Sequence, residues 1–239
     1  MAARKIIIDT DPGQDDAFAL LFALGSPAEL DVIGITTVGG NVPLTLTSRN
    51  ALQIVELAGR SDIPVYAGCP GPMVKKLKTA EYVHGPTGID GLEAPDPVTP
   101  LQPQHAVNYL VNKIMAEPEG DLTVCTLGPM TNLGMAMAME PRIIPRIREV
   151  VLMGGGFFQG GNATPAAEFN IFVDPHAAHV VFESGVPLTM ASIDCTYTAQ
   201  MTPEWINTLR AVGTRSAVQA ANMADFFRRY GSHKFPTEA

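Results

Sequence analysis

Four aspartates follow directly on a short apolar run near the N-terminus. The run is Ile6-Ile7-Ile8, and the aspartates lie in the segment Asp9-Thr10-Asp11-Pro12-Gly13-Gln14-Asp15-Asp16. When carboxylates are buried together, mutual repulsion raises their pKa values unless a cation compensates the charge. Carboxylate oxygens are hard ligands that favour Ca2+ or Mg2+ over zinc. The segment therefore predicts a cation-binding pocket at the end of the first strand.

A simpler interpretation of the same loop is also open. Aspartates at helix starts commonly face solvent and cap the helix. Asp15 and Asp16 open a predicted helix, and Pro12-Gly13 provides the turn before it. Capping requires one such residue, whereas four are present, so we expect the metal pocket and keep solvent-facing aspartates as the alternative.

Short apolar runs alternate with helical patterns along the chain. The predicted strands are 5–9, 30–37, 63–66, 122–127, 149–153 and 188–191, and the predicted helices are 15–24, 45–58, 104–117, 130–140 and 175–184. This alternation predicts an α/β fold, a single domain over residues 1–239 with a mainly parallel, Rossmann-like sheet and helices on both faces. The Pro- and Gly-rich segment 85–104 is expected to be an ordered excursion or a flap.

The connections after the predicted strands carry the polar and glycine-rich sequence. Besides the acidic loop they include Gly39-Gly40-Asn41, Gly128-Pro129 and Gly154-Gly155-Gly156. Ligands of open α/β sheets bind outside the carboxyl ends of the strands. We therefore expect these loops to converge on one crevice.

Composition argues against several classes of partner. Sixteen Lys and Arg against 24 Asp and Glu give a formal net charge of −8, which disfavours nucleic acid or an anionic membrane held by bulk electrostatics. Cys69, Cys125 and Cys195 lack metal-type spacing, so buried free thiols are expected rather than a disulfide framework or a zinc site. We see no secretory leader and no apolar run of the roughly 18 to 20 residues that span a bilayer. A cytoplasmic protein is expected.

The acidic loop resembles the N-terminal hallmark of the inosine-uridine-preferring nucleoside hydrolase family, Asp-x-Asp-Pro-Gly-x-Asp-Asp, which is complete at residues 9–16. Further blocks continue the resemblance in order over about 170 residues: Thr36-Thr37-Val38-Gly39-Gly40-Asn41, His84-Gly85, Thr126-Leu127-Gly128-Pro129-Met130-Thr131-Asn132, Met153-Gly154-Gly155, and Ala167-Glu168-Phe169-Asn170 with Asp174-Pro175. A series of ordered blocks is far more specific than one motif.

The resemblance implies a reaction and a metal site. Members of the family hydrolyse the N-glycosidic bond of ribonucleosides to ribose and free base, using a Ca2+-activated water. Asp11 and Asp16 match side-chain ligands of the Ca2+, and Thr126 matches a ligand that acts through its backbone carbonyl. Asp11 also matches the catalytic carboxylate that takes a proton from the water. Family members are usually homodimers or homotetramers.

The resemblance also implies contacts to a small ribonucleoside substrate. The matching residues are Asp15 and Asn170 for the ribose 2′- and 3′-hydroxyls, Asn162 and Glu168 for the 5′-hydroxyl, Asn41 beside the water and the ribose, and His84 and Phe169 on the base side. The chemistry agrees with an acidic lining, because cleavage passes through a ribosyl cation that carboxylates stabilise.

Each of these assignments has a structural alternative. Asn41 and Asn162 follow Gly-Gly pairs and are candidates for left-handed turn residues. Glu168 and Asn170, two apart in a segment expected to be extended, share one side, where exposed strand polarity is the alternative to a shared ligand. Phe169 then faces the opposite side unless the strand bends. Thr126 could be an ordinary strand-end residue and His84 a structural loop histidine.

The family pattern continues to a His-Asp-Pro-like block that supplies a further metal ligand and a histidine near the leaving base. This sequence reaches Phe235-Pro236-Thr237-Glu238-Ala239 without it. From the resemblance we expect a domain that is C-terminally incomplete relative to the family, with reduced Ca2+ affinity and turnover.

Two other functions compete with hydrolysis. Ile6-Ile7-Ile8-Asp9-Thr10-Asp11 also suits a phosphatase of the haloacid dehalogenase type, with Asp9 as nucleophile, although Pro12-Gly13 departs from that pattern and no Lys-bearing motif follows. A non-catalytic nucleoside- or ribose-binding relative with a retained pocket is the second alternative.

Overall fold

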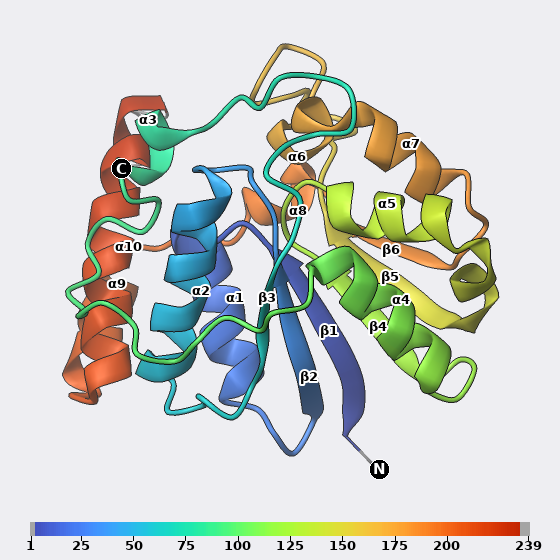
Figure 1. Cartoon of the computed structure of the whole chain (residues 1–239). Coiled ribbons are helices and arrows are strands. Elements are labelled where there is room, and N and C mark those ends of the chain that lie inside the picture. The colour runs from blue at the N-terminus through green and yellow to red at the C-terminus, as the bar shows by residue number, and fades with distance from the viewer. Residues whose placement is uncertain (1–2, 235–239) are drawn as a thin grey trace.

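A six-stranded parallel sheet forms the centre of the molecule (Figure 1). The computed structural model describes residues 3–234, so the segment 235–239, where the family's further block was sought, lies outside the described residues. The strands are β1 (Arg4–Thr10), β2 (Leu30–Thr37), β3 (Val65–Ala67), β4 (Leu122–Thr126), β5 (Ile147–Met153) and β6 (Leu188–Ala191).

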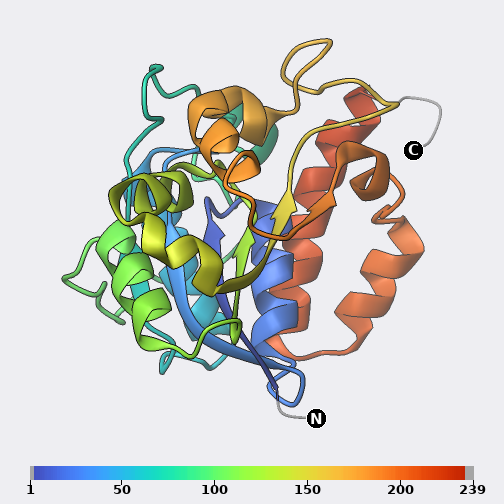
Figure 2. The same cartoon turned by 90° about the vertical axis from the view of Figure 1, so that its right-hand side faces the viewer.

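Helices cover both faces of this sheet. They are α1 (Gln14–Leu24), α2 (Leu44–Leu57), α3 (Glu81–His84), α4 (Ala106–Ala116), α5 (Thr131–Met139), the 3-10 helix η1 (Pro141–Arg146), α6 (Phe169–Val173), α7 (Pro175–Phe182), α8 (Ile193–Thr196), α9 (Pro203–Ala211) and α10 (Arg215–Lys234). Helices α1, α2, α9 and α10 lie on one side, and α4, α5 and α7 on the other (Figure 1). Figure 2 shows α1, α9 and α10 opposite α4 and α5. The expected α/β fold with two covered faces is confirmed.

The side-chain alternation of β1 explains why both faces are covered. Ile6 and Ile8 pack into the core beneath α1 and α2, whereas Ile7 packs into the core beneath α4 and α5. Successive residues of a strand point to opposite faces, so three consecutive isoleucines supply both cores. No helix in the described part of the chain is long and apolar enough to cross a membrane.

The strand order is β3-β2-β1-β4-β5-β6, so the direction of winding reverses between β1 and β4. Such a switch point opens a crevice at the carboxyl ends of the strands. The register brings Asp9 beside Thr36 of β2 on one side and Thr126 of β4 on the other. The acidic loop therefore leaves the sheet at the switch point.

The sequence predicted most of these elements, and the differences have identifiable causes. The strand predicted at 63–66 begins later, as β3 at Val65–Ala67, because Pro64 has no N–H to donate within a sheet. The carbonyl of Pro64 accepts from the N–H of Ile35. The stretch expected to be extended around Glu168 and Asn170 is helical from Phe169, so that prediction is wrong. No element had been predicted after residue 191, where α8, α9 and α10 lie.

The segment 85–104 is an ordered excursion that packs on two helices. The amide of Gln53 in α2 donates to the carbonyls of Ala94 and Pro95, and the N–H of Glu93 donates to Gln219 of α10. Between α3 and α4 its only sheet-type pairing in the described residues is the bridge between Tyr66 and Gln102.

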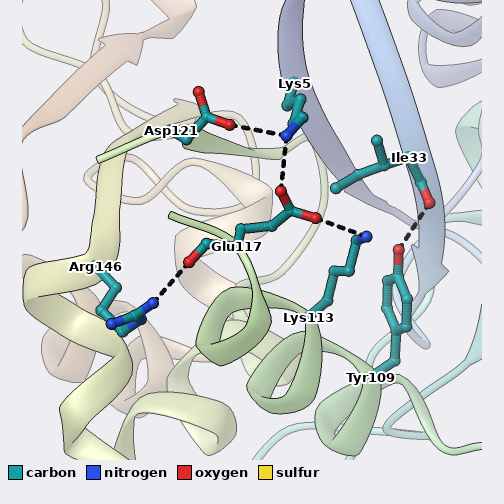
Figure 3. Close-up of polar contacts among 7 residues, drawn as sticks. All are labelled: Lys5, Ile33, Tyr109, Lys113, Glu117, Asp121 and Arg146. Carbon is teal, nitrogen blue, oxygen red and sulfur yellow. Dashed lines mark hydrogen bonds and ion pairs between the residues drawn. The ribbon is translucent and has the colours of Figure 1, made fainter. Parts of the chain in front are cut away.

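The amino end of the sheet carries a separate polar cluster, shown in Figure 3. The Lys5 ammonium contacts Glu117 at 2.8 Å and Asp121 at 2.9 Å, and Lys113 contacts the other oxygen of Glu117 at 2.7 Å. Arg146 donates to the Glu117 carbonyl. Each acid of this cluster has a cationic neighbour.

Candidate active site

The carboxylate of Asp11 is fully buried at the switch point between two glycines. A Cβ at Gly40 would collide with one of its oxygens, and a Cβ at Gly128 with the other. The N–H of Asn41 donates to Oδ2 at 2.7 Å, while Oδ1 has no hydrogen-bond partner among the described residues. A buried carboxylate oxygen without a partner is costly unless a ligand or cation completes it.

Asp16 lies in the first turn of α1 and is also buried. Its Oδ1 accepts from the Thr10 hydroxyl, and its Oδ2 accepts from the N–H of Gly13 at 3.1 Å and more weakly from the Asn41 amide at 3.4 Å. Asp16 therefore caps the helix from inside the crevice. Asp9, Asp11 and Asp16 are buried, so the solvent-facing alternative is wrong for them, whereas Asp15 is exposed.

The pKa values of Asp11 and Asp16 are raised above the ordinary value for an aspartate. Burial, with the charge of Asp15 adding to it, raises the pKa of the Asp16 carboxyl to about 7. Burial and the neighbouring Asp16 raise the pKa of Asp11 well above its ordinary value. None of the ion pairs in the described part of the chain includes either carboxylate. No positive charge among the described residues compensates these two acids.

Asp9 supports the loop from below. Its Oδ1 accepts from the Thr36 hydroxyl at 2.6 Å and from the Asn132 amide at 2.8 Å. The same amide donates to the Thr37 carbonyl, and its oxygen accepts from the N–H of Cys69. Asn132 thus ties the ends of β1, β2 and β3 to the start of α5. Burial raises the pKa of Asp9 to about 7.

A second group of predicted residues meets at the start of α6. Glu168 is the N-cap, and its carboxylate accepts from the backbone N–H groups of Asn170, Ile171 and Gly155. The Asn162 oxygen accepts from the N–H of Phe169 at 2.8 Å. Glutamate is an uncommon N-cap, which is why the sequence did not indicate a helix here.

Asn170 joins this second group to β4 and β5. Its amide donates to the carbonyls of Leu127 and Met153, next to the strand end at Thr126. The Thr126 hydroxyl is buried without a partner among the described residues. No non-glycine residue in the described part has a positive φ, so Asn41 and Asn162 are not left-handed turn residues.

The glycine-rich loops meet around these groups. Gly40 and Gly128 lie against the Asp11 carboxylate, and the N–H of Gly155 donates to Glu168. The nearby charge of Asp15 contributes to raising the pKa values of Asp11, Asp16 and Glu168. The convergence expected from the loops is confirmed.

His84 reaches the crevice wall from α3 and is 6% exposed. Its ring lies against Gly13, where a Cβ would overlap it, and stacks on Phe227 at a centroid distance of 5.6 Å. Gln14 occupies a variable position of the hallmark motif. Its side-chain oxygen lies 2.7 Å from Nδ1 of His84. Gln14 and Asn132 were not singled out from the sequence, because their partners lie far along the chain.

The donor set suits a hard cation. Asp11 and Asp16 present carboxylate oxygens at the end of β1, and Thr126 ends the neighbouring strand. The unpartnered Oδ1 of Asp11 is the atom that a cation would complete. Among the described residues, no group of three or more His, Cys, Asp or Glu side chains is placed to hold a metal.

A doubly covered parallel sheet with buried acids at its switch point has the architecture of the α/β proteins that bind ligands outside the carboxyl ends of their strands. The family model for inosine-uridine preferring nucleoside hydrolases matches residues 6–239, and the chain belongs to that family. It is an N-glycosyl hydrolase.

Relatives and solved structures agree with this membership. The chain is 45% identical to the pyrimidine-specific ribonucleoside hydrolase RihA of Photobacterium profundum, over 98% of this chain and 74% of that protein. It is 42% identical to the inosine-uridine preferring nucleoside hydrolase of Leishmania major, over 95% and 72%. A purine-preferring ribonucleoside hydrolase from Gardnerella vaginalis superposes with a TM-score of 0.93 at 34% identity, over 98% and 74%.

Proposed function

We propose that the crevice hydrolyses the N-glycosidic bond of ribonucleosides to ribose and free base, with Ca2+ bound beside Asp11. The observation that carries the proposal is the Asp11 carboxylate, which is fully buried, caged by Gly40 and Gly128, and has one unpartnered oxygen. Such a group is poised for a ligand rather than for packing.

Asp11, Asp16 and the Thr126 carbonyl would hold the ion. Bound Ca2+ would lower the pKa of a water in its coordination shell. The Asp11 carboxylate would accept the proton from this water, because it is buried beside the proposed ion and one of its oxygens has no hydrogen-bond partner among the described residues. The N–H of Asn41, which donates to the other oxygen, would keep Asp11 in position.

The hydrogen bonds within the protein determine which amide atoms remain for the sugar. The NH2 group of Asn170 donates to two backbone carbonyls, so its oxygen would accept from a ribose hydroxyl. The oxygen of Asn162 accepts from the N–H of Phe169, so its NH2 group would donate to the ribose. With Asp15 and Glu168 they give the ribose both donors and acceptors, and the two carboxylates stabilise a ribosyl cation.

The base lies beside Phe169 and His84 in this proposal. The names of the relatives include pyrimidine-specific, purine-preferring and inosine-uridine preferring enzymes. Inosine and uridine are therefore the two substrates to test first.

Ribose release tests the proposal. The full chain is incubated with inosine or uridine in Ca2+, and free ribose is measured by a reducing-sugar assay, with release of inorganic phosphate from a nucleoside monophosphate measured in parallel. Ribose release that a chelator stops and Ca2+ restores is expected. Binding without ribose would favour the non-catalytic alternative, and phosphate release alone would favour the phosphatase.

Two further expectations stay predictions. These are a cytoplasmic location and a homodimer or homotetramer, which cell fractionation and light scattering would check.

A further inference from the structure

The side chain of Gln14 makes three contacts between the acidic loop and residues 84–90, which span the end of α3 and the start of the segment after it. Gln14 is fully buried at the first position of α1. Its nitrogen lies 2.9 Å from the carbonyl oxygen of His84 and 3.1 Å from that of Asp90, and its oxygen lies 2.7 Å from Nδ1 of the His84 ring.

These three contacts determine which atom of each group carries hydrogen. Backbone carbonyl oxygens only accept, so the Gln14 atom that faces two of them must be the NH2 group. The other terminal atom is then the amide oxygen, which also only accepts. Because that oxygen faces Nδ1 of His84, the hydrogen of this bond belongs to Nδ1.

The surroundings of His84 favour its neutral form. The ring is enclosed by Gly13, by the Gln14 amide and by the stacked ring of Phe227. Burial lowers the pKa of His84, and the nearby Asp15 only partly opposes this. A neutral imidazole holds one hydrogen, so with Nδ1 occupied the lone pair lies on Nε2.

We infer that Gln14 locks His84 as the Nδ1–H tautomer, so that Nε2 accepts a hydrogen bond from an N–H group of the bound base. The part concerning the base rests on the proposed function, and the part concerning the tautomer does not. Gln14 is then a positioning residue, and His84 selects bases that present a ring N–H, such as hypoxanthine or uracil, at this point of the pocket.

The chain offers a matched control in Gln53. This glutamine is also buried, and its amide also donates to two backbone carbonyls, those of Ala94 and Pro95 in the segment 85–104, without a histidine partner. Gln14→Leu and Gln53→Leu therefore each remove an amide that holds two backbone carbonyls. Only the first removes the acceptor that faces His84.

Nitrogen NMR of protein labelled with 15N-histidine tests the tautomer directly. The wild type and Gln53→Leu are expected to show the His84 ring as the Nδ1–H form at neutral pH. Gln14→Leu should shift the population towards Nε2–H, the form that free imidazoles prefer. A wild-type spectrum of the Nε2–H or the doubly protonated ring would overturn the inference, as would an unchanged tautomer in Gln14→Leu.

Addition of separate products tests the contact. Uracil or hypoxanthine, added with ribose and Ca2+, should move the Nε2 signal as an accepted hydrogen bond does, whereas ribose alone should not. A shift with ribose alone, or none with either base, would overturn the assignment of the base N–H.

Kinetics provide the third readout. Gln14→Leu is expected to lower kcat/KM for uridine by about tenfold, the effect of one hydrogen bond to the substrate, and Gln53→Leu by less than about twofold. Equal losses in both variants would show that Gln14 acts only as an anchor. If the wild type releases no ribose at all, the proposed function fails while the NMR result still decides the tautomer.

Discussion

The two ends of the sheet carry acidic clusters that are built in opposite ways. At the amino end, Glu117 lies between Lys5 and Lys113, and Lys5 also pairs with Asp121 (Figure 3). Hydrogen bonds from the two lysines lower the pKa of Glu117. These acids are compensated within the chain, so they need no ligand.

At the carboxyl end, Asp11 and Asp16 are buried without any ion pair in the described part of the chain, and burial raises both pKa values. The difference teaches that the presence of acids does not identify a site. What identifies it is missing compensation, because an uncompensated buried charge is retained only where a ligand or reaction uses it.

The largest expected effect comes from removing one charge at each end. Asp11→Asn should lower ribose release from inosine or uridine by about 10^3-fold, because the general base is lost while the shape of the side chain is kept. Glu117→Gln should leave the rate within about twofold of the wild type. Steady-state kinetics of both variants measure this, and near-normal turnover of Asp11→Asn would remove Asp11 from the mechanism.

The next effect concerns the response of stability to Ca2+. A concentration of Ca2+ 100 times its Kd stabilises the folded state by about 2.7 kcal/mol, which raises the Tm of a chain of this size by roughly 5 to 10 °C. Thermal melts in chelator and in Ca2+ should show this increase for the wild type and for Glu117→Gln. Asp16→Asn should lose most of it, and an undiminished increase in that variant would contradict its role as a ligand.

The smallest effect is the pH dependence of the compensated cluster. Because the folded pKa of Glu117 is depressed, its stabilising contribution is present above the unfolded value of about 4.3 and is lost as pH falls through the folded value. Glu117→Gln should be less stable than the wild type at pH 7 by about 1 kcal/mol or less, as for other partly exposed pairs. Urea titrations should show the difference begin to shrink as pH falls below about 4.3, disappear once the pH is below the folded pKa of Glu117, and shrink in high salt. A difference that does not shrink on acidification would exclude the ion pairs as its cause.

The sequence predicted those features that depend on local pattern. The apolar run 30–37 became β2 with the same bounds, and four closely spaced aspartates located the crevice. Features that depend on contacts between distant segments were not predictable. Glu168 became a helix cap only through tertiary placement, which overrode its local preference.

The candidate site shows the same division. Asp11, Asp16 and Asn41 were expected from the family resemblance, and the structure brings them into hydrogen-bond contact. The hydrogen bond between Gln14 and His84 joins residues 70 positions apart, and nothing in the local sequence around either residue indicates it.

Gly40 and Gly128, which enclose the Asp11 carboxylate, have a consequence for the entropy of the reaction. Because backbone lies against both of its oxygens, the Asp11 side chain is confined when the chain folds, and little of its conformational entropy remains to be lost when a substrate binds. An alanine at either position would collide with the carboxylate, so these two glycines fix the orientation of Asp11 by having no side chain of their own.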